Sequence, residues 1–157
     1  MTLFTTIYSP IGVLRLTSDG TALTGLYTQT HAPDDTQWEQ ADDLAIFDCA
    51  RCWLDAYFTG KSKAVDFPLS PAGTVFQRQV WEILLTIPYG ETRSYGTIAK
   101  SFGHNMSAQA VGQAVGKNPI SILIPCHRVV GAKGQLTGYA GGLETKKWLL
   151  RHEEETK

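Results

Sequence analysis

A thiol, an imidazole and a guanidinium stand side by side after a run of apolar residues, in the sequence SILIPCHR (residues 121–128). A cysteine becomes a strong nucleophile when a base or a cation stabilises its thiolate, so its neighbours could activate Cys126. Successive side chains of a strand point to opposite faces, which would separate Cys126 from His127. Pro125 cannot donate to a strand ladder. We therefore expect a buried strand that breaks at Pro125, followed by a turn that brings both side chains into one pocket.

A catalytic Cys-His pair usually needs a third group that orients the imidazole. Two acids later in the chain, Glu144 and Glu153, are candidates for this role. Each residue also has a purely structural interpretation, because a lone cysteine is often a buried hydrophobic group and a carboxylate in the sequence HEEE is ordinarily solvated. Arg128 is expected to tie the turn to nearby carbonyls or acids. Residue chemistry alone leaves a nucleophilic and a structural Cys126 both open.

Short helices in the second half of the chain must position these residues. The segment TVFQRQVWEILLTIPYG has apolar residues at helical spacing and ends at a proline and a glycine. SYGTIAKSFG opens on Ser94, a good N-cap, and MSAQAVGQAVGKNP follows as another short helix. Two short helices joined by a tight turn suggest a helix-turn-helix. Their small residues would let the backbone approach DNA, but they would equally suit close packing between helices.

The first part of the chain has a different character. Residues 3–27 alternate apolar segments with turn signals, which predicts a small antiparallel meander. The polar stretch HAPDDTQWEQ predicts a loop, and apolar spacing over residues 44–58 predicts a helix. DFPLSPAG, with two prolines and a glycine, is the candidate linker. We therefore expect an N-terminal α/β lobe over residues 1–70 and a C-terminal lobe over residues 71–157.

Composition favours a soluble globular protein. The chain has 157 residues, of which 43% are hydrophobic and 18% charged, and no apolar run approaches the roughly 20 residues of a membrane span. The N-terminus has no basic region before its apolar residues, unlike a secretory signal. Three cysteines suit a reducing compartment. These features predict a cytoplasmic protein without a membrane partner.

Charge is divided unevenly along the chain. Up to Ser70 there are four Lys/Arg against nine Asp/Glu, a balance of −5, whereas from Pro71 there are ten against six, a balance of +4. A polyanion would therefore bind the second lobe. Such an imbalance also arises by chance, so this feature alone does not establish binding to nucleic acid.

The remaining thiols and histidines carry weaker signals. Cys49 and Cys52 form a Cys-x-x-Cys pair in the predicted first-lobe helix, which could ligate a metal or undergo redox chemistry. No second ligand pair follows, so packing against the core is the favoured interpretation. His31 and His104 are expected in solvated loops, and His152 is expected on a helix surface.

The segments NPISILIPCHRVVG and GYAGGLETKKWLLRHE together resemble the signature of the O6-alkylguanine-DNA alkyltransferases, the methylated-DNA–protein-cysteine methyltransferases. The resemblance extends from about Phe76 to Glu153, and the first lobe matches only in layout. It implies an α+β fold, with a ribonuclease-H-like N-terminal lobe of a small sheet plus helix. The C-terminal lobe would be mostly helical and winged-helix-like, with a helix-turn-helix.

The resemblance also implies a reaction. The protein would bind double-stranded DNA containing O6-alkylguanine, flip the damaged base into a pocket, and transfer the alkyl group to Cys126. His127 would act as the base through a water molecule, and Glu153 would orient it. The thioether formed on Cys126 is stable, so each molecule would react once. The resemblance implies a monomer that needs neither a metal nor another cofactor, and O4-alkylthymine is a further expected substrate.

The resemblance assigns roles to further residues. Asn118 would hold the turn around Cys126, and Tyr95 would crowd the phosphate of the flipped nucleotide and help protonate the leaving guanine. The backbone amides of Val129 and the GYAGG segment could stabilise the charge that develops on that base. The pocket would be lined by Val129, Tyr139, Ala140 and Gly141. The DNA contacts would come from Tyr95, Ser107, Ala108, Gln109 and Gly112.

The recognition helix departs from the family pattern at one position. Relatives usually carry an arginine that enters the base stack where the nucleotide has left, and the matching residue here is Gln109. Glutamine can fill the gap and hydrogen-bond to the orphaned base, but it lacks the charge and the stacking plane of arginine. A module that recognises alkylated DNA without repairing it is the alternative function, although the presence of Cys126 argues against it. A Cys-His hydrolase or a plain helix-turn-helix regulator would leave Asn118 and Tyr95 unexplained.

Overall fold

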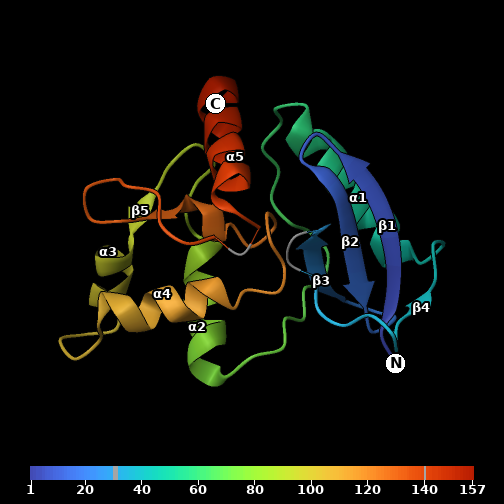
Figure 1. Cartoon of the computed structure of the whole chain (residues 1–157), viewed down its shortest axis with the longest axis horizontal. Helices are drawn as coiled ribbons and strands as arrows, with labels where there is room; N and C mark the ends of the chain where they lie inside the picture. The colour runs from blue at the N-terminus through green and yellow to red at the C-terminus, as the bar shows by residue number, and fades with distance from the viewer. Residues whose placement is uncertain (30–31, 140) are drawn as a thin grey trace.

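A computed structural model describes residues 1–29, 32–139 and 141–157, and it shows a small sheet-containing lobe beside a mostly helical one (Figure 1). The first lobe holds a four-stranded sheet in the order β3-β2-β1-β4. Its strands are β1 (Leu3–Ser9), β2 (Gly12–Ser18), β3 (Leu23–Thr28) and β4 (Glu39–Gln40). The first three strands form the predicted antiparallel meander. The short β4 pairs in parallel with β1, within a stretch that the sequence predicted to be a loop.

Turn residues between the strands and alternating buried side chains along them shape this sheet. The Asp19 carboxylate accepts hydrogen bonds from two backbone amides after it, and Gly20 has a φ of 109°, a left-handed conformation that suits glycine. Leu14 and Leu16 alternate along β2 and are fully buried. Helix α1 (Ala45–Phe58), which the apolar spacing predicted, places its buried residues toward this core and ends before Gly60.

Three capped helices form the scaffold of the second lobe. They are α2 (Val75–Leu84), α3 (Tyr95–Lys100) and α4 (Ala108–Gly116). Thr74 and Gln77 form a capping box at α2, and the hydroxyl groups of Ser94 and Ser107 cap the other two helices. The Trp81 indole donates to the carbonyl of Ala114 at 2.8 Å, which fixes α4 across α2. The helix pair α3–α4 thus forms where the sequence predicted a helix-turn-helix.

The chain after α4 carries the remaining elements of this lobe. These are the 3₁₀ helix η2 (Cys126–Arg128), the strand β6 (Val129–Val130), which pairs in parallel with β5 (Arg93–Ser94), and the final helix α5 (Leu143–Thr156). Helix α5 rises between the two lobes in Figure 1, with its last turns close to the C-terminal end of α1. This position lets α5 contact both lobes.

The apolar run before Cys126 is not a strand, contrary to the sequence prediction. The amide of Leu123 donates to the carbonyl of Ser121 at 2.8 Å, around Ile122 with a φ of 71°. This is a tight three-residue turn that is rare for a β-branched residue. The run is buried as expected, but side-chain hydrogen bonds replace a strand ladder there. Short apolar runs do not distinguish a strand from another buried segment, which explains the error.

Backbone hydrogen bonds join the two lobes at the edge strand β3. The amide of Leu26 donates to the carbonyl of Pro119 at 2.8 Å, and the amide of Ser121 donates back to Leu26 at 3.4 Å. The buried apolar residues of both lobes form one continuous core. Within the described part of the chain, no helix combines the length and apolar character needed to cross a bilayer.

Candidate active site

Pro125 turns the chain so that Cys126 and His127 enter one short 3₁₀ helix. Pro125 has a φ of −79° and a ψ of 66°, and the Cys126 amide donates to the carbonyl of Ile124 at 2.7 Å. These are the features of an inverse γ-turn. The helix that follows ends when the amide of Val129 donates to the carbonyl of Cys126. The predicted turn at Pro125 is therefore present, although no strand precedes it, and Cys126 is 5% exposed.

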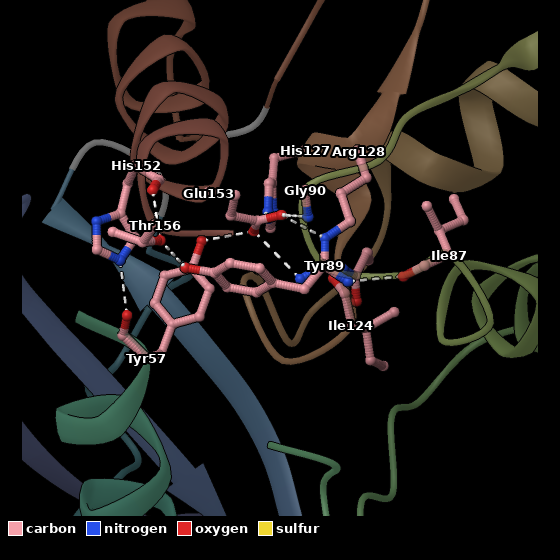
Figure 2. Close-up of polar contacts among 11 residues, drawn as sticks. Tyr57, Ile87, Tyr89, Gly90, Ile124, His127, Arg128, His152, Glu153 and Thr156 are labelled. Atoms are coloured by element: carbon pink, nitrogen blue, oxygen red, sulfur yellow. Dashed lines mark hydrogen bonds and ion pairs between the residues drawn. The ribbon is translucent and has the colours of Figure 1, made fainter. Parts of the chain in front are cut away.

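Glu153 on α5 lies at the centre of a buried polar cluster (Figure 2). Its Oε2 atom is 2.5 Å from Nε2 of His127, and its Oε1 atom accepts from Nε of Arg128 at 2.8 Å. Nη2 of Arg128 also reaches Oε2 at 3.2 Å, while Nη1 donates to the carbonyl of Ile87 at 2.7 Å. Arg128 thus ties the turn to an acid and a carbonyl, as predicted. Of the two candidate acids, Glu153 contacts the imidazole and Glu144 has a side chain that is 91% exposed.

The groups around Glu153 keep its carboxylate ionised. Burial alone would raise the pKa of Glu153, but hydrogen bonds and charge interactions with His127 and Arg128 outweigh burial and hold the pKa well below its usual value of 4.5. An ionised carboxylate only accepts hydrogen bonds, so Nε2 of His127 must carry the proton between them. Burial lowers the pKa of His127 despite the attraction of Glu153, which favours the neutral imidazole. Its other nitrogen, Nδ1, is then an unprotonated acceptor.

This free nitrogen makes His127 suitable as a base. Nδ1 is buried and has no hydrogen-bond partner among the described residues. Burial raises the pKa of the adjacent Cys126 thiol, while the Asn118 amide and the Lys146 ammonium partly oppose that rise. The resting thiol is therefore protonated. A buried thiol beside an oriented, neutral imidazole can form a thiolate when that imidazole takes up the thiol proton.

Asn118 holds the turn that precedes the thiol. Its Nδ2 atom donates to the carbonyls of Ile124 at 2.9 Å and Ile120 at 3.3 Å, and its Oδ1 atom accepts from the amide of Ile120 at 3.0 Å. The side chain therefore supplies hydrogen bonds that a strand ladder would otherwise provide. This geometry agrees with the placement of Asn118 beside Cys126 that the sequence resemblance implied.

Sequence reasoning missed Lys146, a lysine that is fully buried. Its Nζ atom donates to the carbonyls of Val129 at 2.7 Å and Thr137 at 3.0 Å, so it joins the strand after Cys126 to the loop before α5. Burial lowers the pKa of Lys146, and the charge of Cys126 partly offsets this. Its spacing to Leu149 and Glu153 puts the three residues on one face of α5. That helical periodicity is the sequence signal that could have identified Lys146 as buried.

The structure places the predicted pocket wall around Cys126 only in part. Val129 is fully buried, but its amide already closes the 3₁₀ helix, so the expected role of this amide toward the leaving group is wrong. The Tyr139 hydroxyl is buried and has no hydrogen-bond partner within the described ranges. A Cβ atom on Gly141 would come within 2.8 Å of the Tyr139 ring, so a larger residue would displace the tyrosine. Ala140 lies outside the described residues.

The predicted DNA-contacting residues divide into two groups. Ser107, Ala108 and Gln109 are exposed at the N-terminal end of α4, where the Ser107 hydroxyl accepts from the amide of Ala110. Gly112 instead faces Tyr95, since an added Cβ atom would lie 3.6 Å from that ring. This placement favours helix packing for Gly112. Tyr95 begins α3, and its hydroxyl accepts a hydrogen bond from Thr137 at 3.1 Å.

The positions of the other thiols and histidines differ in part from those predicted. Cys49 and Cys52 are exposed on the outer face of α1, so the prediction that they pack in the core is wrong. The buried residues of α1 lie on the other face of the helix. Across the ranges that the structure covers, His, Cys, Asp and Glu form no group of three that could hold a metal ion. His104 is exposed as expected, His31 lies outside the described residues, and His152 is half-buried, stacked on Trp148.

Comparisons with known proteins identify the family of this chain. Residues 75–155 match the family described as 6-O-methylguanine DNA methyltransferase, DNA binding domain, and residues 2–71 match its ribonuclease-like domain. A Mycobacterium bovis methylated-DNA–protein-cysteine methyltransferase is 50% identical over 96% of this chain and 92% of that protein. A Methanosarcina acetivorans protein of the same name is 45% identical over 92% and 94%. The structure of Mycobacterium tuberculosis OGT in complex with DNA is 48% identical, with a TM-score of 0.90 over 98% of this chain and 94% of that one.

Proposed function

Because the chain belongs to the 6-O-methylguanine DNA methyltransferase family, we propose that it repairs DNA by transferring the alkyl group of O6-alkylguanine in a duplex to Cys126. The observation that carries this proposal is the buried His127–Glu153 pair next to the buried Cys126, in the same lobe as the helix pair α3–α4. The boundary between the lobes near residue 70, action as a monomer, and activity on O4-alkylthymine belong to the same proposal.

The reaction is a displacement at the alkyl carbon. The Cys126 proton passes to Nδ1 of His127 through a water molecule, and the resulting thiolate attacks the carbon attached to O6. An S–C bond forms as the C–O6 bond breaks, and guanine leaves with the electron pair and then takes up a proton. Nothing in this sequence of steps cleaves the thioether. Each protein molecule is therefore consumed by one alkyl group.

Glu153 keeps the base ready for this proton transfer. Its charge stabilises the imidazolium that forms when His127 accepts the proton, and its short contact fixes the ring with Nδ1 free. Because the Val129 amide is already bonded, stabilisation of the leaving guanine falls to the loop that holds Tyr139 and Gly141. Tyr95, held by Thr137 beside that loop, is the proposed donor of a proton to the leaving base.

Helix α4 is the proposed recognition helix. Ser107, Ala108 and Gln109 stand exposed at its first turn, where they can approach DNA from the minor-groove side. Extruding the damaged base leaves a gap in the stack, and Gln109 is the side chain placed to enter it. Tyr95 would press against the phosphate of the flipped nucleotide. No metal or other cofactor takes part in these steps.

A single incubation tests this function. The protein is mixed with a duplex oligonucleotide that carries one O6-methylguanine, and the modified residue is located by mass spectrometry. We expect one methyl group on Cys126 and loss of activity in proportion to it. Cys126→Ala should abolish transfer while DNA binding stays nearly intact, and Cys49→Ala, which removes an exposed thiol, should transfer normally. More than one turnover per molecule would contradict the proposal, and tight binding without transfer would favour a recognition module.

A further inference from the structure

The first lobe sends one side chain into the catalytic cluster. Tyr57, in the last turn of α1, donates its hydroxyl hydrogen to Oε2 of Glu153 at 2.7 Å, across 96 residues of sequence (Figure 2). Tyr57 is 1% exposed. We propose that Tyr57 is a positioning residue for alkyl transfer, whose hydroxyl fixes the Glu153 carboxylate and limits how strongly that carboxylate holds a proton on His127. This inference rests on the proposed function.

The two oxygens of Glu153 are fully engaged. Oε2 receives Tyr57 as well as His127 and Arg128, and Oε1 receives Arg128 and the backbone amide of Gly90 at 3.0 Å. Tyr57 and His127 therefore share one carboxylate oxygen. Each donor draws negative charge toward itself, so the Tyr57 bond weakens the attraction of this oxygen for the imidazole proton.

Packing alone does not account for the hydroxyl group. The Tyr57 ring is already held by aromatic neighbours, stacked on Trp53 at 5.4 Å and edge-on to Phe58 at 5.3 Å and Tyr89 at 5.8 Å. Phenylalanine would make the same ring contacts. The ring contacts therefore do not explain the hydroxyl group, which donates its hydrogen bond to Glu153. Burial and the nearby carboxylate raise the pKa of Tyr57, so it remains a protonated donor throughout the working range of pH.

The charged and titratable groups around His127 come from several elements. Glu153 and Lys146 face it from α5, Arg128 and Cys126 lie on its own turn, and Tyr57 approaches Glu153 from α1. Tyr139, from the loop before α5, lies near Cys126 and Glu153. Removing the Tyr57 hydroxyl leaves every formal charge in this set unchanged. The change therefore acts through the carboxylate alone, which makes the pKa of His127 the direct readout.

The test compares Tyr57→Phe with a matched control, Tyr89→Phe. Tyr89 is a neighbouring tyrosine whose hydroxyl bonds to Thr156 outside the cluster. In Tyr57→Phe the carboxylate holds the imidazole proton more strongly, so the pKa of His127 should rise, as measured by NMR titration of the imidazole. Single-turnover transfer should slow about tenfold at neutral pH, because the carboxylate loses a donor that fixes it and so no longer holds the imidazole in the orientation that proton transfer needs. The acid limb of the pH–rate profile should move to higher pH, and Tyr89→Phe should match the unmodified protein in each measurement.

Three results would overturn the inference. The first is an unchanged His127 pKa in Tyr57→Phe, and the second is an equal shift in Tyr89→Phe. A lower melting temperature with an unmoved acid limb would also contradict it, because that is the effect of packing alone. If the unmodified protein transfers no alkyl group, the proposed function fails, whereas the NMR titration still decides whether Tyr57 acts on His127 through Glu153.

Discussion

Single residues determine how this site makes and uses a thiolate. His127 has one nitrogen held by Glu153 and a second, Nδ1, with no hydrogen-bond partner in the described part of the chain. The contact with Glu153 therefore both orients the ring and leaves Nδ1 to act as the base. Cys126 is buried beside a fully buried ammonium group, that of Lys146, which supplies positive charge without solvent. The nucleophile therefore depends on two kinds of neighbour, a proton acceptor and a fixed cation.

The cation effect is tested by replacing Lys146 with methionine, which keeps the length of the side chain. Because Lys146 opposes the rise in the Cys126 pKa, its removal should raise that pKa further. The pH dependence of the reaction between Cys126 and iodoacetamide measures the shift. Lys147→Met is the control, since Lys147 is exposed and pairs with Glu144. Equal curves for both variants would show that the Lys146 charge does not reach the thiol.

Gln109 is the residue where this chain departs from its family pattern. Gln109→Arg should bind DNA at least as tightly and transfer the alkyl group faster, because arginine adds charge and a stacking plane at the gap in the base stack. Single-turnover rates and DNA titrations measure both effects. Gln113→Arg adds the same charge one turn further along α4, where Gln113 is also exposed, and should strengthen binding without the gain in rate. An unchanged or lower rate for Gln109→Arg would contradict this prediction.

At the scale of elements, a strained turn carries the nucleophile. Ile122 adopts a φ of 71° although it is β-branched, a conformation that costs about 1–2 kcal/mol. The residue is 1% exposed, and deleting a buried isoleucine side chain costs about 2–5 kcal/mol. Burial therefore outweighs strain and holds the turn in place. The segment needs its apolar residues for packing rather than for a strand.

This balance predicts the effect of Ile122→Gly. The variant relieves the strain but loses the buried side chain, so its free energy of unfolding should fall by about 1–3 kcal/mol, as measured by urea denaturation. Ile122→Val keeps the branched Cβ and should cost only about 0.5–1.5 kcal/mol. A glycine variant more stable than the original protein would show that strain dominates at this turn.

Local sequence signals predicted the elements better than the contacts between them. The meander, α1 and the α3–α4 pair follow from periodicity, capping residues and turn residues, which act over a few positions. The apolar run at Ile122 predicts a strand by pattern alone, because a buried strand and a buried turn segment leave the same run of apolar residues. Cys126, His127 and Glu153 were recognisable from motifs. Tyr57 and Lys146 were missed, because the contact of Tyr57 depends on docking between lobes and a lysine on an amphipathic helix ordinarily reaches solvent.

At the scale of the whole molecule, the catalytic cluster also contributes to stability. Glu153 has a lowered pKa, so its contribution is complete above its usual value of 4.5 and is lost as pH falls below it. His127 has a pKa below its usual 6.5, so the unfolded chain binds that proton first and acidification through this value also destabilises the fold. Both groups act in the same direction. The protein should therefore lose stability on acidification in two overlapping steps.

Urea unfolding at a series of pH values tests this linkage with Glu153→Gln. At neutral pH the variant should lose about 3–5 kcal/mol, because Arg128 keeps its buried charge without a counter-charge. It should also lose the part of the pH dependence below 4.5 that belongs to Glu153, and keep the part that belongs to His127. Glu154→Gln changes the exposed neighbour and should behave like the original protein. A Glu153→Gln profile parallel to that of the original protein would refute this account.

The convergence of distant segments on Glu153 also determines when the catalytic site forms during folding. Its donors come from residue 57, residue 90 and residues 127–128, while the acceptor lies on the last helix. Closing loops of this length is slow compared with forming single helices. The site is therefore assembled only when both lobes and α5 have come together. A partly folded chain would have an exposed thiol without its base network, so competence to react and completion of folding are one event.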